Sequence, residues 1–195
     1  MAAVIEPTLR FHESGLVGAG PGVWYGTDAP NGDAGDWARA PIGTRYYRRL
    51  SAGGGIWFEK VSNKQLDGDW RPTSGAIIQT VTESQFTDGG AQVGTLVLTD
   101  GIPVGATVVR TFLQALTGFT GDTSCALTVG DGTDVDRYMT GTPSIYTTAA
   151  GETDLGAISG VAYHSAAKSV TLTATSNADW TAVTAGAMTV VIVLG

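Results

Sequence analysis

The densest group of side chains able to bind a metal ion is a short acidic segment. It reads Gly-Asp-Gly-Thr-Asp-Val-Asp-Arg-Tyr and carries carboxylates at Asp131, Asp134 and Asp136. Carboxylate oxygens are the ligands that Ca²⁺ prefers, but the spacing lacks the later bidentate Glu of an EF-hand, and no helical pattern flanks it. Asp and Gly are also common residues of tight turns, where the Asp side chain bonds to its own backbone. We therefore expect a turn without a metal ion at residues 130–138, with Ca²⁺ binding as the alternative.

The other side chains with catalytic chemistry are two histidines and one cysteine. His12 lies in a segment without regular periodicity, and His164 precedes Ser165, which would point to the opposite face of a strand. Cys125 sits in an apolar alternation typical of a small buried residue, and a single cysteine allows no intrachain disulfide. No Gly-x-Ser-x-Gly, Walker or His-Glu-x-x-His motif is present. The sequence therefore predicts no enzyme activity, no cofactor and a structural role for His164.

Residues with the chemistry of a protein-binding surface are concentrated in the first 75 positions. Arginine next to large aromatic rings is the composition of interface hot spots. We predict a partner-binding set that consists of Trp24, Tyr25, Trp37, Arg45, Tyr46, Tyr47, Arg48, Arg49, Trp57 and Phe58. An aromatic groove for nucleic acid or glycan is the alternative. Residues 1–75 carry 8 basic and 8 acidic side chains, which argues against nucleic acid.

Composition excludes several classes of protein. The 195 residues include 28 Gly, 15% charged residues and a net charge of −7, which disfavours nucleic acid and anionic membrane as partners. The longest apolar run near the end of the sequence, residues 190–194, is far shorter than the roughly 20 residues of a membrane-spanning helix. The first residues lack the basic and apolar regions of a signal peptide. We therefore expect a soluble protein made in a reducing cytosol, not a basic DNA-binding protein, a collagen or a coiled coil.

The sequence divides into three segments that differ in amino-acid composition and charge. Residues 1–40 are punctuated by Pro and Gly, so we expect an extended arm without regular structure, packed on its own domain or on a neighbouring subunit. Residues 41–75 predict a β-hairpin attachment module, with strands at 44–50 and 56–61, a glycine loop at 51–55 and a turn at 67–72. Residues 76–195 hold 3 basic and 10 acidic side chains, and we expect them to fold separately.

The third segment has the periodicity of strands. Residues 170–175 alternate apolar and threonine side chains, residues 125–129 alternate similarly, and 106–117 do so imperfectly. Residues 188–194 are apolar on both faces, as in a strand central to a packed sheet. Glycine turns separate about eight such strands. The predicted fold is all-β: an antiparallel β-sandwich of jelly-roll type over residues 76–195, preceded by the arm and the hairpin.

Several segments resemble virion structural proteins of tailed bacteriophages. Residues 102–110, 117–124 and 129–138 are similar to a β-rich domain of these proteins, and the hairpin from Tyr46 to Trp70 resembles small modules of phage fibre and head-appendage proteins. The resemblance implies a virion component, commonly oligomeric and often a homotrimer, and it transfers no catalytic residue. The expected partners are the major capsid protein or other virion proteins, and the expected location is the virion, assembled in the host cytoplasm.

Two functions fit this resemblance. The first is a capsid decoration or head-appendage protein that binds the shell through its N-terminal part. The alternative is a tail, baseplate or fibre component that binds a host surface glycan.

Overall fold

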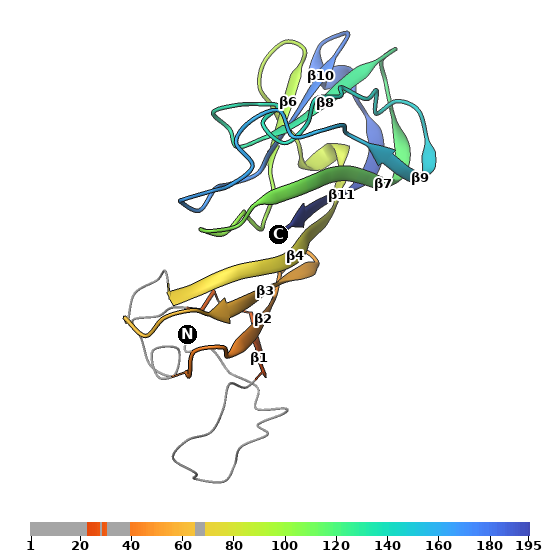
Figure 1. Ribbon diagram of the computed structural model, residues 1–195. Coiled ribbons are helices and arrows are strands. Elements are labelled where there is room, and N and C mark those ends of the chain that lie inside the picture. The colour runs from red at the N-terminus through yellow and green to blue at the C-terminus, as the bar shows by residue number, and fades with distance from the viewer. Residues whose placement is uncertain (1–22, 28, 31–39, 65–68) are drawn as a thin grey trace.

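The fold is all-β, as the sequence predicts, and consists of two sheets packed face to face as in a β-sandwich (Figure 1). A computed structural model describes residues 23–27, 29–30, 40–64 and 69–195. The larger sheet has seven strands in the order β1-β2-β3-β4-β11-β7-β9, and the smaller has four in the order β5-β6-β10-β8. All pairings are antiparallel except the parallel pair β1–β2.

The strands have the following bounds. The seven-stranded sheet consists of β1 (Val23–Gly26), β2 (Arg45–Arg49), β3 (Gly54–Lys60), β4 (Trp70–Thr82), β11 (Ala185–Leu194), β7 (Val108–Thr120) and β9 (Ala149–Asp154). The four-stranded sheet consists of β5 (Thr87–Asp88), β6 (Val93–Val97), β10 (Thr171–Ser176) and β8 (Cys125–Gly130). Two short 3₁₀ turns, η2 (Glu83–Gln85) and η3 (Trp180–Ala182), complete the described elements.

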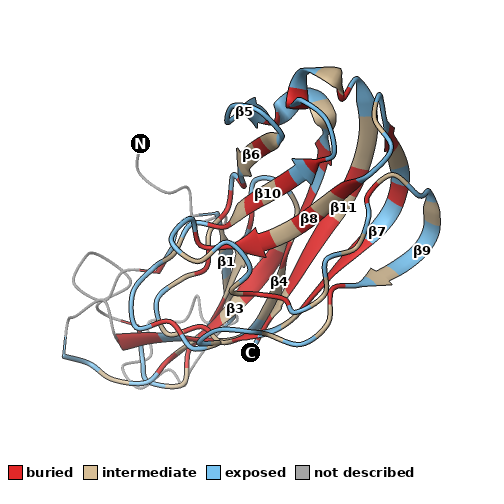
Figure 2. Cartoon of the chain, turned by 90° about the horizontal axis from the view of Figure 1, so that it is seen from above, coloured by how far each residue is buried: buried red, intermediate tan, exposed pale blue. Residues whose placement is uncertain are grey.

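The main core lies between the two sheets. In β11 the alternate residues Met188, Val190 and Ile192 are fully buried, and Leu172 of β10 and Leu127 of β8 are buried in the facing sheet. Figure 2 shows this alternation as buried segments that interrupt exposed ones along the strands. β11 pairs with β4 on one side and β7 on the other, so its predicted central position is confirmed.

The predicted boundary at residue 75 falls inside a strand. β4 is 13 residues long; its first half pairs with β3, and its second half pairs with β11. The turn expected at residues 67–72 is therefore wrong for Trp70, Arg71 and Pro72, which begin β4. The hairpin module and the sandwich share one continuous sheet, which Figure 1 shows extending downward from β11 through β4 to β1.

The N-terminal segment contains a strand that its composition did not predict. Residues 23–26 form β1 and pair in parallel with β2, in the register Trp24 to Tyr46 and Tyr25 to Tyr47. Most of the predicted arm lies outside the described residues. The hairpin strands β2 and β3 are confirmed. The loop between them is residues 50–53, one residue shorter than the expected 51–55, because β2 ends at Arg49 and β3 begins at Gly54.

Candidate interaction surface

Strands β1–β4 form the N-terminal part of the seven-stranded sheet, and this part is called the small sheet. The small-sheet surface is the row of Tyr25, Arg45, Tyr47 and Trp57 on β1, β2 and β3, in which Tyr25 and Arg45 are exposed and Tyr47 and Trp57 are half-buried. Residues that pair directly across strands project to the same face of a sheet. The registers place Tyr25 beside Tyr47 and Tyr47 beside Trp57, and Trp57 lies opposite Ser74 of β4. Ile77 of β4 is buried in the core between the sheets, whereas Ser74 is exposed on the other face of β4. The row therefore lies on the face of the seven-stranded sheet that the four-stranded sheet does not cover.

The rings of the small-sheet surface are in mutual contact. Their centroids are 5.0 Å apart for Tyr47 and Trp57, 6.1 Å for Tyr25 and Trp57, and 6.3 Å for Tyr25 and Tyr47. The Arg45 guanidinium carbon lies 5.9 Å from the Trp57 ring centroid, within the range of a cation–π interaction. Tyr25 is 39% exposed. This arrangement holds three aromatic rings and one cation together on a single face of the sheet.

A second aromatic row lies on the opposite face and is interior. Tyr46 and Phe58 pair across β2 and β3 and are only 1% and 4% exposed, and Tyr46 packs against Trp70 at 6.4 Å. Trp24 lies 6.3 Å from Trp70 and packs against the same cluster. The prediction placed Trp24, Tyr46 and Phe58 at the partner surface, but the structure places them in or against the hydrophobic core beside strands β1–β4. Their role there is to stabilise β1–β4.

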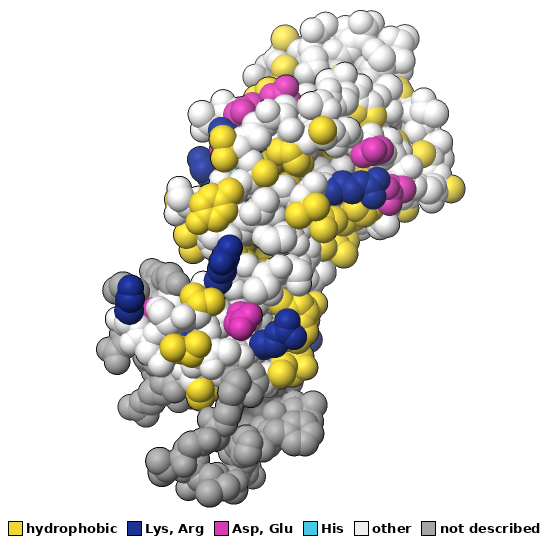
Figure 3. Space-filling view, in the orientation of Figure 1, with side chains coloured by type: hydrophobic (Ala, Val, Ile, Leu, Met, Phe, Trp, Pro, Cys, Tyr) yellow, Lys and Arg dark blue, Asp and Glu magenta, His cyan; other side chains and the backbone are white. Residues whose placement is uncertain are grey.

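The remaining predicted residues divide between the surface and the undescribed part of the chain. Arg49 is exposed at the end of β2, and Arg48 donates from Nε to the backbone oxygen of Thr27, 3.1 Å away, which fastens the end of β1 to β2. Trp37 lies outside the described residues. In Figure 3 hydrophobic, basic and acidic side chains lie next to one another on the lower part of the molecule, formed by β1–β4.

The acidic segment is a turn whose first carboxylate is an internal anchor. The Asp131 side chain is fully buried, and its Oδ1 accepts hydrogen bonds from the backbone amides of Thr133 and Asp134, at 3.1 and 3.0 Å. Its Oδ2 lies 3.0 Å from Arg137 Nε and 3.1 Å from Lys168 Nζ. The expected turn is therefore observed, and its first carboxylate, Asp131, joins the turn to the loop that carries Lys168.

Hydrogen bonds and cations control the charge of Asp131. Burial by itself raises the pKa of this carboxyl, but the Asp134 amide, Lys168, the Thr133 amide and the Arg137 charge together lower the pKa to about 2. The group is ionised throughout the neutral range. In the described part of the chain, no three His, Cys, Asp or Glu side chains are grouped so as to hold a metal ion.

Cys125 lies in the interior, as predicted, and so does His164, for which the sequence predicts only a structural role. The His164 ring is 5.6 Å from the Tyr138 ring, edge to face, and its residue is 4% exposed. Burial lowers the pKa of His164, and the nearby charges of Arg137 and Lys168 lower it further, against the opposing effect of Asp131. Cys125 is fully buried, and burial, followed by the charge of Asp122, raises the pKa of its thiol to about 12.

The buried neutral His164 makes stability depend on pH. The unfolded chain binds a proton at this residue below pH 6.5, whereas the folded chain resists it, so stability is complete above pH 6.5 and falls as the pH drops below it. We expect a loss of up to about 1.4 kcal/mol per pH unit between pH 6.5 and 5, measured by urea unfolding. Asp131 adds no slope in this range, because its unfolded pKa is 3.8 and its full contribution to stability is present above that pH.

His164→Gln removes this slope, while the matched substitution of the other histidine, His12→Gln, leaves it unchanged. Equal slopes in the wild-type protein and His164→Gln would contradict the assignment.

Comparisons with known proteins identify no relative of this chain. No family model, no curated protein and no solved structure matches the chain. None of the helical segments in the described part of the chain has the length and hydropathy of a transmembrane helix.

Proposed function

We propose that this protein is a structural component of a bacteriophage virion, a capsid decoration or head-appendage protein that attaches to the capsid shell through the small-sheet surface. The proposal combines the sequence resemblance to phage virion proteins with the surface of Tyr25, Arg45, Tyr47 and Trp57. In this role the protein forms a homo-oligomer, expected to be a trimer, and its partners are the major capsid protein or other virion proteins. It has no catalytic step.

The observation that carries the proposal is the preordered aromatic row, in which Tyr25 is exposed and the half-buried Tyr47 and Trp57 support it. Aromatic rings and arginine dominate the energetics of protein interfaces, and rings already packed together lose little side-chain entropy on binding. Tyr25 lies at the outer end of the row, in contact with both Tyr47 and Trp57, and keeps 39% of its surface exposed. The sandwich, with its excess of acidic residues, then projects from the attachment site and keeps the particle surface soluble.

Tyr25→Ala should weaken attachment at least tenfold. Truncation of a hot-spot residue costs about 2 kcal/mol or more, and Tyr25 is the most exposed ring of the row. The measurement is co-sedimentation of the purified protein with particles produced without it, over a concentration series. The matched control is Tyr163→Ala, because Tyr163 is also exposed, at 53%, but lies on the sandwich.

Attachment of the Tyr163→Ala protein should stay within about twofold of wild type. If Tyr163→Ala abolishes co-sedimentation and Tyr25→Ala does not, the sandwich carries the attachment surface and the proposed orientation is reversed. A circular dichroism spectrum of each variant establishes that its sheet is intact.

A further inference from the structure

The segment that connects β9 to β10 passes along the start of β7 (Figure 1), and its residues 156–167 are called the strap. Two of its backbone hydrogen bonds to the chain before β7 are made by His164. The His164 amide donates to the Ala106 oxygen at 3.0 Å, and the His164 oxygen accepts from the Gly105 amide at 2.7 Å. The strap therefore covers the backbone that leads into β7, and His164 lies at the centre of this contact.

His164 is the residue by which the strap enters the interior. It is 4% exposed, whereas every other residue of the strap is exposed or half-buried. Its ring packs edge to face against the ring of Tyr138, 5.6 Å away, and Tyr138 is fully buried. Ile158 is the strap's other contact with the core, and it is only partly buried. The closed position of the strap therefore depends mainly on the state of one imidazole ring.

The packing around this ring suits an uncharged imidazole. Its Nε2 and the Tyr138 hydroxyl are both buried, and neither has a hydrogen-bond partner within the described part of the chain. Residues 102–108, which the strap covers, include no titratable side chain. A buried charge is costly unless hydrogen bonds and an opposite charge compensate it. A protonated His164 therefore needs partners that the closed strap does not supply.

The charges that act on the ring are cationic in sum. They are Arg137 of the acidic turn, Lys168 just beyond the strap, and the buried carboxylate of Asp131. Asp131 already binds both cations, at 3.0 and 3.1 Å, and two backbone amides of its own turn. Asp134 pairs with Arg137 at 3.7 Å, but its side chain is 38% exposed, so solvent screens it. A proton on His164 adds a third cation to this group, whose one buried carboxylate is already occupied.

We propose that the strap is a pH-sensitive switch: protonation of His164 expels its ring from the interior and opens the strap while the sandwich stays folded. Lys168 remains in place as the hinge, because its backbone exchanges hydrogen bonds of 2.9 and 2.8 Å with Ile102 and its ammonium stays paired with Asp131. Opening uncovers the Tyr138 ring and the backbone of residues 105–108. The proposal does not depend on attachment to a capsid, and it goes beyond overall stability because it places the first effect of acid in one segment.

Native-state hydrogen exchange of the full-length protein tests the switch residue by residue. The amides of Gly105, Val108 and position 164 report on the strap, because each takes part in a hydrogen bond with it. Their protection, read by NMR and corrected for the intrinsic exchange rate, should fall about tenfold between pH 7 and pH 5. One proton shifts the opening equilibrium by at most about tenfold per pH unit below pH 6.5.

Added urea separates opening of the strap from unfolding of the protein. Local opening exposes little surface, so exchange at Gly105, Val108 and position 164 should change less than about twofold in 1 M urea at pH 5. The amide of Val190, a buried residue of the central strand β11, should exchange only on global unfolding and should lose protection steeply with urea.

Substitutions separate the charge of the ring from its shape. His164→Phe keeps an aromatic ring against Tyr138 and cannot take up a proton, so its strap amides should keep their protection within about twofold from pH 7 to pH 5. His164→Gln should be equally independent of pH, even where its looser packing lowers the protection at both pH values. The matched control is His12→Gln, which removes the other histidine and should retain the tenfold loss.

Three results would overturn the proposal. The first is equal protection of the strap amides at pH 7 and pH 5 in the wild-type protein. The second is a loss in acid with the same urea dependence as Val190, which means that the whole protein unfolds. The third is an equal loss in His164→Phe or His164→Gln, which means that another group responds to acid.

Discussion

Replacing Asp131 by alanine should lower the free energy of unfolding by about 3 kcal/mol. Its carboxylate is fully buried and accepts two backbone amides of its own turn. It also binds Arg137 and Lys168, which lie on different loops, so its removal leaves two cations close together without their shared partner. Urea unfolding at pH 7, followed by circular dichroism, measures the loss.

Asp134→Ala is the matched control for this prediction. Asp134 is in the same turn and also pairs with Arg137, at 3.7 Å, but its side chain is 38% exposed. Exposed ion pairs contribute about 0–1 kcal/mol, so this variant should lose no more than that. Equal losses in the two variants would contradict the anchoring role of Asp131.

The pH dependence of Asp131 has a definite sign. Its folded pKa of about 2 lies below the unfolded value of 3.8, so its contribution is complete above pH 3.8 and is lost as the pH falls towards 2. Asp131→Asn should retain part of the turn, because an amide oxygen still accepts the backbone hydrogen bonds, but it should abolish this part of the acid dependence.

Most strands followed from the sequence because they bury one face. β10 alternates apolar residues with threonine, and the apolar set is the one that the core receives. β4 was missed at its start because Trp-Arg-Pro after Asp and Gly has the composition of a turn. Pairing with β3 overrides that local preference and extends the strand back to Trp70.

Local pattern could not separate the two faces of the small sheet. Tyr46 and Tyr47 are adjacent and chemically alike, yet Tyr46 is 1% exposed and Tyr47 belongs to the small-sheet surface. The choice depends on Trp70, a distant residue that packs against Tyr46. In the same way, the acidic turn was predictable from Asp and Gly, but its partner Lys168 lies 37 residues from Asp131 in the sequence, and no local signal joins them.

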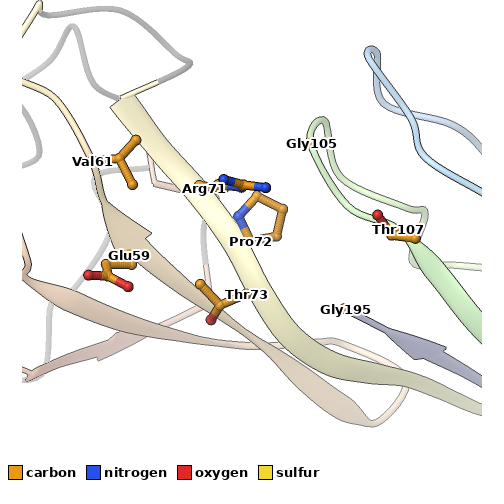
Figure 4. A pocket seen from close by; sticks show the side chains of 8 residues that line it. All are labelled: Glu59, Val61, Arg71, Pro72, Thr73, Gly105, Thr107 and Gly195. Carbon is orange, nitrogen blue, oxygen red and sulfur yellow. The ribbon is translucent and has the colours of Figure 1, made fainter.

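A groove of about 340 Å³ beside β4 had no signal in the sequence (Figure 4). Its walls come from residues 59, 61, 71–73, 105, 107 and 195, and it exists because β4 is longer than its pairing with β11. The misplaced start of β4 therefore also hid the groove.

A fragment of residues 76–195 should fold on its own and fail to co-sediment with particles. The fragment retains all but one of the pairs between β4 and β11, the whole of β7 and β9, and the complete smaller sheet. It loses the contact with β3, in which Gly55 pairs with Ala76, Gly54 pairs with Ile77 and Ile78 donates to Gly53, and it loses the hydrogen bond from the Ala52 amide to Asp100. The fragment lacks the small-sheet surface, so circular dichroism should show a cooperative β-sheet melt, with attachment absent.

A fragment of residues 83–195 is the control, because it also removes β4. In that fragment β11 becomes an edge strand, and its buried residues Val190 and Ile192 lose the neighbouring strand that contributes Ile77 and Val81 to the core. It should be unfolded or aggregated. If the 76–195 fragment is unfolded as well, the small sheet is an essential part of the fold. If that fragment folds and still sediments with particles as well as the full chain does, the sandwich is the attachment surface, since Tyr25, Arg45, Tyr47 and Trp57 are then absent.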